Sequence, residues 1–172
     1  RRESLKNRAS RLKGQVDASA LEYFDSYALD ILRSAYAQIP QKAQAAIFFE
    51  QEIQPGSGKK IVDQWYQLYQ GCLAMLDQSW FSQSAKEHDE YRVFRHAIPV
   101  LVNSILRQYH QTKIGTDFTV PNEHFFDLFE LYRRNLRDAG LWYCIFGHIA
   151  DNHLHVNLLP QNDQEADRGW EI

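Results

Sequence analysis

Apolar residues recur every three or four positions along three long stretches of the chain, 18–36, 59–77 and 122–139. This spacing puts the apolar side chains on one face of a helix, so the first stretch is predicted to be mostly helix and the other two to be helices. The third stretch has Asn122 as its predicted N-cap. It ends before Gly140, which suits the left-handed residue that often follows a helix.

Two shorter helical segments, 86–97 and 99–110, are predicted from a similar pattern. Pro99 is expected to separate them, because a proline lacks a backbone N–H and crowds the preceding turn. The last segment, 161–172, is polar and has no hydrophobic periodicity, so no element is predicted there.

Short runs of β-forming residues lie between the helical stretches. Residues 45–53 (AAIFFEQEI) and 116–120 (TDFTV) are each predicted to be a strand. Segments 141–146 (LWYCIF) and 153–159 (HLHVNLL) are joined by GHIADN, which is rich in turn formers, so they are predicted to form an antiparallel hairpin. This order of elements favours a single α+β domain over residues 1–172, an antiparallel sheet covered on one face by helices.

Composition and charge narrow the choice of partners. The 172 residues include 19 Lys and Arg against 22 Asp and Glu, a formal net charge of -3, which argues against nucleic acid or anionic lipid as a partner. The apolar runs are far shorter than the roughly 20 residues that span a bilayer, so no transmembrane segment is expected. Cys72 and Cys144 lie far apart without a CxxC pattern, which favours a reducing compartment. We expect a cytoplasmic protein, either free or peripheral to the inner membrane.

The two ends of the chain look incomplete. The first residues, RRESLKNRASRLKGQ, contain no initiator methionine and no apolar core after the charges, which is typical of neither a signal peptide nor a natural start. The final residues stop without a helix-stop or strand-stop signal. We therefore expect that sequence is missing at both ends.

The most informative candidate chemistry lies in the second strand of the predicted hairpin. Side chains alternate along a strand, so His153, His155 and Asn157 point to one face while the residues between them point to the other. His148, at the entry to the turn, can fold back toward His155. Imidazole nitrogens suit zinc, iron, copper or nickel, but hairpin histidines that only form hydrogen bonds would have the same spacing. The spacing leaves both interpretations open.

The segment FGHIADNHLHVNLLP resembles the GHIGDGNLHVN signature of the FAD-linked oxidases. This family contains D-lactate dehydrogenase, glycolate oxidase and D-2-hydroxyglutarate dehydrogenase. Four other segments resemble that family's C-terminal domain in order and approximate spacing, so the resemblance covers residues 18–160. They are ALEYFDSYAL, AAIFFEQEI, FRHAIP and TDFTVP.

The resemblance implies a ferredoxin-like α+β substrate domain, an antiparallel sheet covered by helices, that packs over FAD held by a separate N-terminal domain. That flavin domain is not in this sequence, so we expect the chain alone to be inactive and its uncovered surface to allow self-association. The implied reaction of the whole enzyme is oxidation of a D-2-hydroxy acid, such as D-lactate, to the 2-oxo acid, with the flavin taking the hydride.

The resemblance also implies roles for individual residues. His148 and His155 match the two histidines that bind a divalent metal, zinc or iron, in metal-dependent members, and Asn157 matches an asparagine that faces the substrate. Arg95 matches an arginine that binds the substrate carboxylate, for which the planar guanidinium fork is well suited. His155 or His153 would accept the hydroxyl proton, a role that competes with metal binding.

The sequence departs from the family signature at several positions. Ala150 and Asn152 each replace a glycine, and His153 stands where the family usually has asparagine, so His153 could be an additional ligand, a proton acceptor or a simple replacement. Lys113 is displaced from the register of a lysine found in some members and is left unassigned. The implied third metal ligand is a glutamate in a later Glu-His-Gly segment that this chain does not reach. We therefore expect weak or absent metal binding.

A different class of function is also compatible with the sequence. A non-catalytic α+β interaction module could use its aromatic side chains, which include Trp65, Tyr66, Tyr69 and Trp142, to bind a partner protein. Aromatic residues at helical spacing are more often core residues, because they dominate burial. A hydrolytic metal site has no support, since the chain lacks HExxH and clustered carboxylates.

Overall fold

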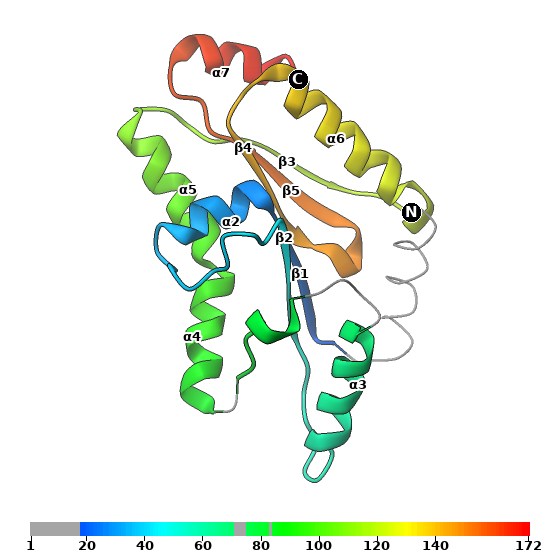
Figure 1. Cartoon of the computed structure of the whole chain (residues 1–172). Coiled ribbons are helices and arrows are strands. Elements are labelled where there is room, and N and C mark those ends of the chain that lie inside the picture. The colour runs from blue at the N-terminus through cyan, green and yellow to red at the C-terminus, as the bar shows by residue number, and fades with distance from the viewer. Residues whose placement is uncertain (1–17, 71–74, 83) are drawn as a thin grey trace.

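The computed structural model describes residues 18–70, 75–82 and 84–172, which form a five-stranded sheet flanked by helices (Figure 1). The strands are β1 (Ala20–Asp25), β2 (Ala45–Glu50), β3 (Ile114–Thr119), β4 (Tyr143–His148) and β5 (His153–Leu158). Their order across the sheet is β2-β1-β4-β5-β3, and every neighbouring pair is antiparallel. The predicted α+β class, an antiparallel sheet covered by helices, is confirmed.

The described helices lie on both faces of this sheet. They are α2 (Ser26–Arg33), α3 (Gly58–Gln70), α4 (Ala85–Arg95), α5 (Ala97–Gln108), α6 (Phe125–Ala139) and α7 (Asp163–Trp170). Apolar side chains of α2, α4 and α5 form one core with Phe24 and Cys144, while α6 packs on Leu154 and Val156 in a second core. The prediction that helices cover only one face is wrong, because β4 and β5 carry buried side chains on both faces.

The first predicted helix is a strand followed by a short helix. Residues of β1 pair with β2 on one edge and with β4 on the other, so tertiary hydrogen bonding determines their extended backbone. The apolar spacing of the 18–36 stretch is that of α2, where Asp25 caps the helix by accepting a hydrogen bond from the Ala28 amide at 2.7 Å.

Two helix boundaries differ from the prediction. The break between α4 and α5 lies at His96, and Pro99 is the third residue of α5, where a missing N–H costs nothing because first-turn amides have no partner within the helix. Asn122 does not cap α6. It lies in a 3-10 turn (Asn122–His124), and its side chain accepts a hydrogen bond from Asn152 at 2.7 Å instead.

The polar C-terminal segment contains a helix that the sequence analysis missed. The Asn162 side chain accepts from the Glu165 amide at 2.9 Å, and the Glu165 carboxylate accepts from the Gln161 amide at 2.9 Å, so α7 begins with reciprocal capping hydrogen bonds. Because this signal is polar, hydrophobic periodicity does not detect it.

The other predicted elements are confirmed with shifted ends. Residues 45–53 contain β2, residues 116–120 lie within a longer β3 apart from Val120, and β4 and β5 form the antiparallel hairpin. Gly140 ends α6 in the left-handed conformation, at φ 63°. The helix predicted over 59–77 is α3, which ends at Gln70, and a 3-10 turn follows at Leu76–Gln78; Cys72 lies outside the described residues.

The aromatic residues proposed as a partner surface divide between core and exterior. Trp65 is buried and stacks on Phe49 with ring centroids 3.8 Å apart, and Trp142 packs against the first core. Tyr66 is exposed. Among the described residues, no helix has the length and apolar character needed to cross a bilayer.

Candidate functional site

The sheet register brings His148, His153 and His155 together on one face. His148 on β4 lies opposite Glu22 on β1 and opposite His153 on β5. His155, two residues along β5, lies opposite Asp117 on β3. Residues that face each other across neighbouring strands share a face of the sheet, so two carboxylates border the three histidines, which we call the histidine group.

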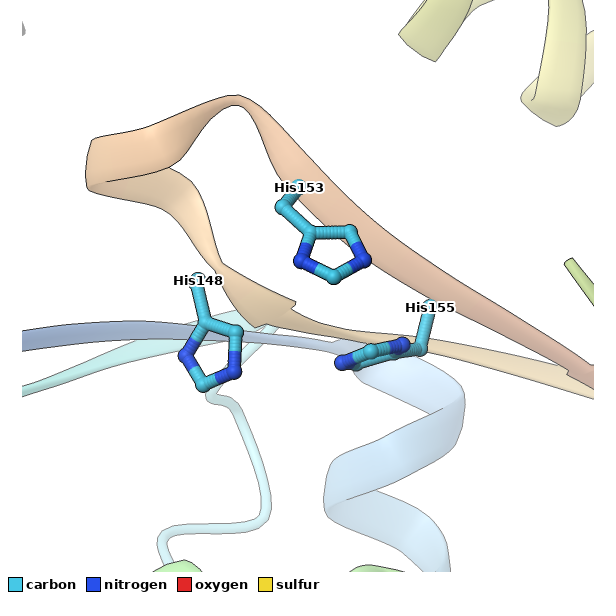
Figure 2. Close-up of side chains that lie close together, drawn as sticks. All are labelled: His148, His153 and His155. Atoms are coloured by element: carbon cyan, nitrogen blue, oxygen red, sulfur yellow. The ribbon is translucent and has the colours of Figure 1, made fainter. Parts of the chain in front are cut away.

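The histidine group is compact and partly open to solvent. One nitrogen from each ring lies within 4.8 Å of the other two, and the side chains of His148, His153 and His155 are 43%, 28% and 26% exposed. Figure 2 shows a nitrogen of each ring facing the space between the three rings. The predicted approach of His148 to His155 is therefore observed, and His153 joins them.

Carboxylates engage one nitrogen of each ring and leave the other available. Glu22 Oε1 lies 2.8 Å from His148 Nδ1, and Asp117 Oδ1 contacts His155 Nδ1 at 3.0 Å and His153 Nε2. An ionised carboxylate only accepts, so these ring nitrogens carry the hydrogens. The lone pairs are then on His148 Nε2, His153 Nδ1 and His155 Nε2. A carboxylate that fixes the imidazole tautomer in this way is common around protein metals, so the residues fit a cation.

Local interactions change two pKa values in the group. The hydrogen bond from His153 holds the pKa of Asp117 below its usual range, and the nearby His155 adds to this effect. Burial lowers the pKa of His155, and the neighbouring His153 lowers it further. His155 is therefore neutral near pH 7, the form that either binds a metal or accepts a proton.

Arg95, the last residue of α4, reaches the same group through Glu22. Its Nε and Nη2 donate to Glu22 Oε1 at 2.9 and 2.6 Å, and its Nη1 lies 3.8 Å from Glu50 Oε2. Glu22 is 5% exposed and thus joins a guanidinium and an imidazole through one buried oxygen. A guanidinium has five N–H donors, so most of the Arg95 fork is not used by Glu22.

A hollow of about 280 Å³ opens next to the histidine group. His155 and Asn157 line it together with Asp117 and Lys113. Arg95 and His148 are not among its lining residues. Gly115 also borders the hollow, and a Cβ there would lie 2.9 Å from the Asn157 side-chain oxygen, so this glycine leaves room for the buried amide.

The turn between β4 and β5 accommodates the departures from the family signature. Asn152 takes the left-handed conformation, at φ 54°, which asparagine tolerates better than most residues. Gly147 has φ 131°, and a Cβ there would lie 2.8 Å from His155 Cδ2. Of the three glycines of the signature, this chain keeps only Gly147, the position where a side chain would collide with the His155 ring.

Two members of the site, Glu22 and Asp117, were not identified from the sequence. Both lie in segments that resemble the family, ALEYFDSYAL and TDFTVP, so the segments were recognised but their acidic residues were not singled out. In the chain, Glu22 lies 126 residues from His148, and Asp117 lies 36 residues from His153 and 38 residues from His155. Only the sheet register brings such distant residues together.

Comparison with known proteins adds one result. The family model described as FAD linked oxidases, C-terminal domain, matches residues 3–171. A search of curated proteins found no match.

Proposed function

Because the chain belongs to the FAD linked oxidases, C-terminal domain family, we propose that it is the substrate-side domain of a flavin-dependent dehydrogenase that oxidises a D-2-hydroxy acid, such as D-lactate, to the 2-oxo acid. Residues 1–172 would form one domain, and a separate N-terminal domain would hold most of the FAD. Bound flavin would accept the hydride from C2, and the residues of this chain would bind and orient the substrate.

The observation that carries this proposal is the convergence of imidazole, guanidinium and amide groups at one end of one sheet face. Arg95 supports binding of the substrate carboxylate, since Glu22 accepts only from Nε and Nη2 and leaves the remaining N–H groups of the fork for a second acceptor. Asn157 lies in the wall of the hollow, where its amide can orient the substrate. Lys113 places a positive charge in that wall.

The hydroxyl proton would go to His155 or His153. Both imidazoles contact Asp117, which fixes their orientation and stabilises a proton gained by either ring. The low pKa of His155 favours its neutral form, as a proton acceptor requires. A divalent metal held by His148 and His155 would, when bound, polarise the 2-hydroxyl group. An imidazole cannot bind a metal and accept the proton through the same nitrogen, so these roles of His155 are alternatives.

The test is oxidation of D-lactate, L-lactate and D-2-hydroxyglutarate by the FAD-loaded parent enzyme with an artificial electron acceptor. We expect Arg95→Ala to lower kcat/KM for the D-acid at least about 100-fold, since a charge-assisted contact to the carboxylate is lost. His155→Ala should lower kcat by roughly 100-fold or more. Flavin absorbance is measured for each variant, so that a loss of flavin is distinguished from a loss of chemistry.

Arg92→Ala is the matched control, because Arg92 lies one turn earlier on α4 and is exposed. It should leave kcat/KM unchanged. Wild-type activity in Arg95→Ala and His155→Ala would refute the proposed site, and an enzyme that reduces its flavin with none of these acids would refute the substrate class.

A further inference from the structure

We propose that the histidine group is a metal site complete within this chain, in which His153 supplies the third nitrogen ligand to a zinc-type divalent cation beside His148 and His155. This inference deepens the proposed function, since it decides between two roles of His153. It is argued from the geometry of the three rings and their carboxylate partners, and it needs neither flavin nor substrate.

The three lone pairs are already directed by the carboxylates. Hydrogen bonds to Glu22 and Asp117 assign the lone pairs to His148 Nε2, His153 Nδ1 and His155 Nε2. With Zn–N bonds of about 2.0–2.1 Å, tetrahedral ligand nitrogens lie about 3.4 Å apart. One nitrogen of each ring lies within 4.8 Å of the other two, so modest rotations of these partly exposed side chains would bring them into range.

The donor set selects the class of cation. Three neutral imidazoles are borderline ligands that favour zinc, cobalt, nickel, copper or ferrous iron over the hard cations magnesium and calcium. Glu22 and Asp117 lie behind the rings as charge partners, as carboxylates do in many histidine-bound metal sites. Three protein ligands leave one tetrahedral position open, the arrangement of a catalytic rather than a structural zinc site. His155 borders both the histidine group and the hollow, so substrate in the hollow lies next to the cation.

This inference replaces the expectation of weak or absent binding that the resemblance suggested. That expectation assumed that the third ligand is a glutamate outside the chain. Here, His153 occupies the signature position where the family usually has asparagine, and its ring centroid lies 4.6 Å from that of His155 and 5.7 Å from that of His148. With all three imidazoles bound to the cation, neither His153 nor His155 accepts the hydroxyl proton, which passes instead to solvent water at this partly exposed group.

The experiment is a calorimetric titration of the whole chain, stripped of metal with a chelator, with ZnCl2 and separately with MgCl2. We expect one Zn²⁺ per chain and no Mg²⁺ binding. His153→Asn, which restores the usual family residue, should weaken Zn²⁺ binding at least roughly tenfold, because loss of a direct ligand should exceed the effect of losing a ligand's hydrogen-bond partner. His124→Ala is the control, since His124 is exposed and lies outside the group, and it should bind as wild type.

Cobalt provides a second measurement that reports on the ligands themselves. Wild-type chain loaded with Co²⁺ should show the visible absorption of four-coordinate cobalt, and His153→Asn should lose or shift it. Far-UV circular dichroism is measured for each sample to verify folding. A folded wild-type chain that binds no Zn²⁺ would overturn the site. Equal Zn²⁺ affinity and an equal Co²⁺ spectrum in His153→Asn would overturn the role of His153.

The two proposals fail separately. Zn²⁺ binding as described, in a parent enzyme that oxidises no D-2-hydroxy acid, would refute the proposed function and leave the metal site intact. Oxidation that depends on Arg95, with no Zn²⁺ binding to the histidine group, would refute the metal site alone.

Discussion

Strand β1 carries two buried carboxylates on opposite faces of the sheet, and they meet different partners. Glu22, 5% exposed, accepts from Arg95 and contacts His148 on the face of the sheet that carries the histidine group, which we call the site face. Asp25, 8% exposed, accepts from the backbone amide of Ala28 on the other face, and burial raises its pKa to about 6. Asp25 caps a helix, whereas Glu22 joins two groups of the candidate site. Burial of a carboxylate therefore does not by itself place it in the candidate site; the side chains paired with it do.

The same division runs along β5. Leu154, Val156 and Leu158 are buried in the second core, while His153, His155 and Asn157 lie on the site face. Adjacent residues of one strand thus have different surroundings, since one set packs in a core and the other belongs to the candidate site. Substitutions on the two faces should separate stability from metal binding and activity.

The largest expected effect is that of Leu154→Ala, which removes a fully buried side chain from the second core. It should lower the free energy of unfolding by about 3 to 4 kcal/mol, the transfer free energy of the lost atoms plus the cavity that remains. Its neighbour His153→Ala, on the partly exposed face, should cost less than about 1 kcal/mol. Urea denaturation measures both. Similar losses for the two variants would contradict the division between the faces.

A smaller effect concerns the pH dependence that Asp25 confers. Its folded-state pKa of about 6 lies above the ordinary value of 3.8. As the pH rises, Asp25 therefore loses its proton in the unfolded chain before it does so in the folded protein. The free energy of unfolding should therefore fall from about pH 4 to pH 6 and stay lower above that range, by about 2 to 3 kcal/mol from this group. Below about pH 4, Asp25 is protonated in both the folded and the unfolded protein, and its contribution to the free energy of unfolding is at its most favourable.

Asp25→Asn should remove this dependence while keeping the helix cap, because an asparagine oxygen also accepts the Ala28 N–H. Urea denaturation of both proteins at about pH 4.5 and about pH 7.5 isolates the contribution of Asp25. An equal pH dependence in the two proteins would mean that Asp25 is ionised throughout and that burial does not dominate its titration.

Among the three buried residues Leu154, Asp25 and Glu22, the smallest expected effect on stability is that of Glu22→Gln. The amide keeps an oxygen that accepts from Arg95 but removes the negative charge, and Arg95 is partly hydrated, so the expected loss is about 1 kcal/mol. Zn²⁺ affinity should fall by roughly 10-fold, since the His148 orientation loses its charged partner. Glu90→Gln, in an exposed pair with Lys86, is the matched control and should change neither quantity. Unchanged Zn²⁺ affinity in Glu22→Gln would exclude a positioning role for Glu22.

The predictability of the fold varies with the range of the interactions. The hairpin of β4 and β5 was predictable because its turn formers and alternating side chains are local signals, and Gly140 marked the end of α6 for the same reason. β1 was mistaken for helix because its extended conformation depends on β2 and β4, which lie elsewhere in the chain. Helix α7 was missed because its capping groups are polar.

For the candidate site, the sequence determined that His153, His155 and Asn157 share one face of a strand and that His148 lies at the turn beside them, since strand alternation and a short hairpin are local. Tertiary structure alone decided that Glu22 and Asp117 hold the rings and that Arg95 shares the Glu22 oxygen. These contacts join β1, β3 and α4 to the hairpin across long stretches of chain. They arise from the order and register of the strands, which non-local hydrogen bonds and core packing select and which no local pattern specifies.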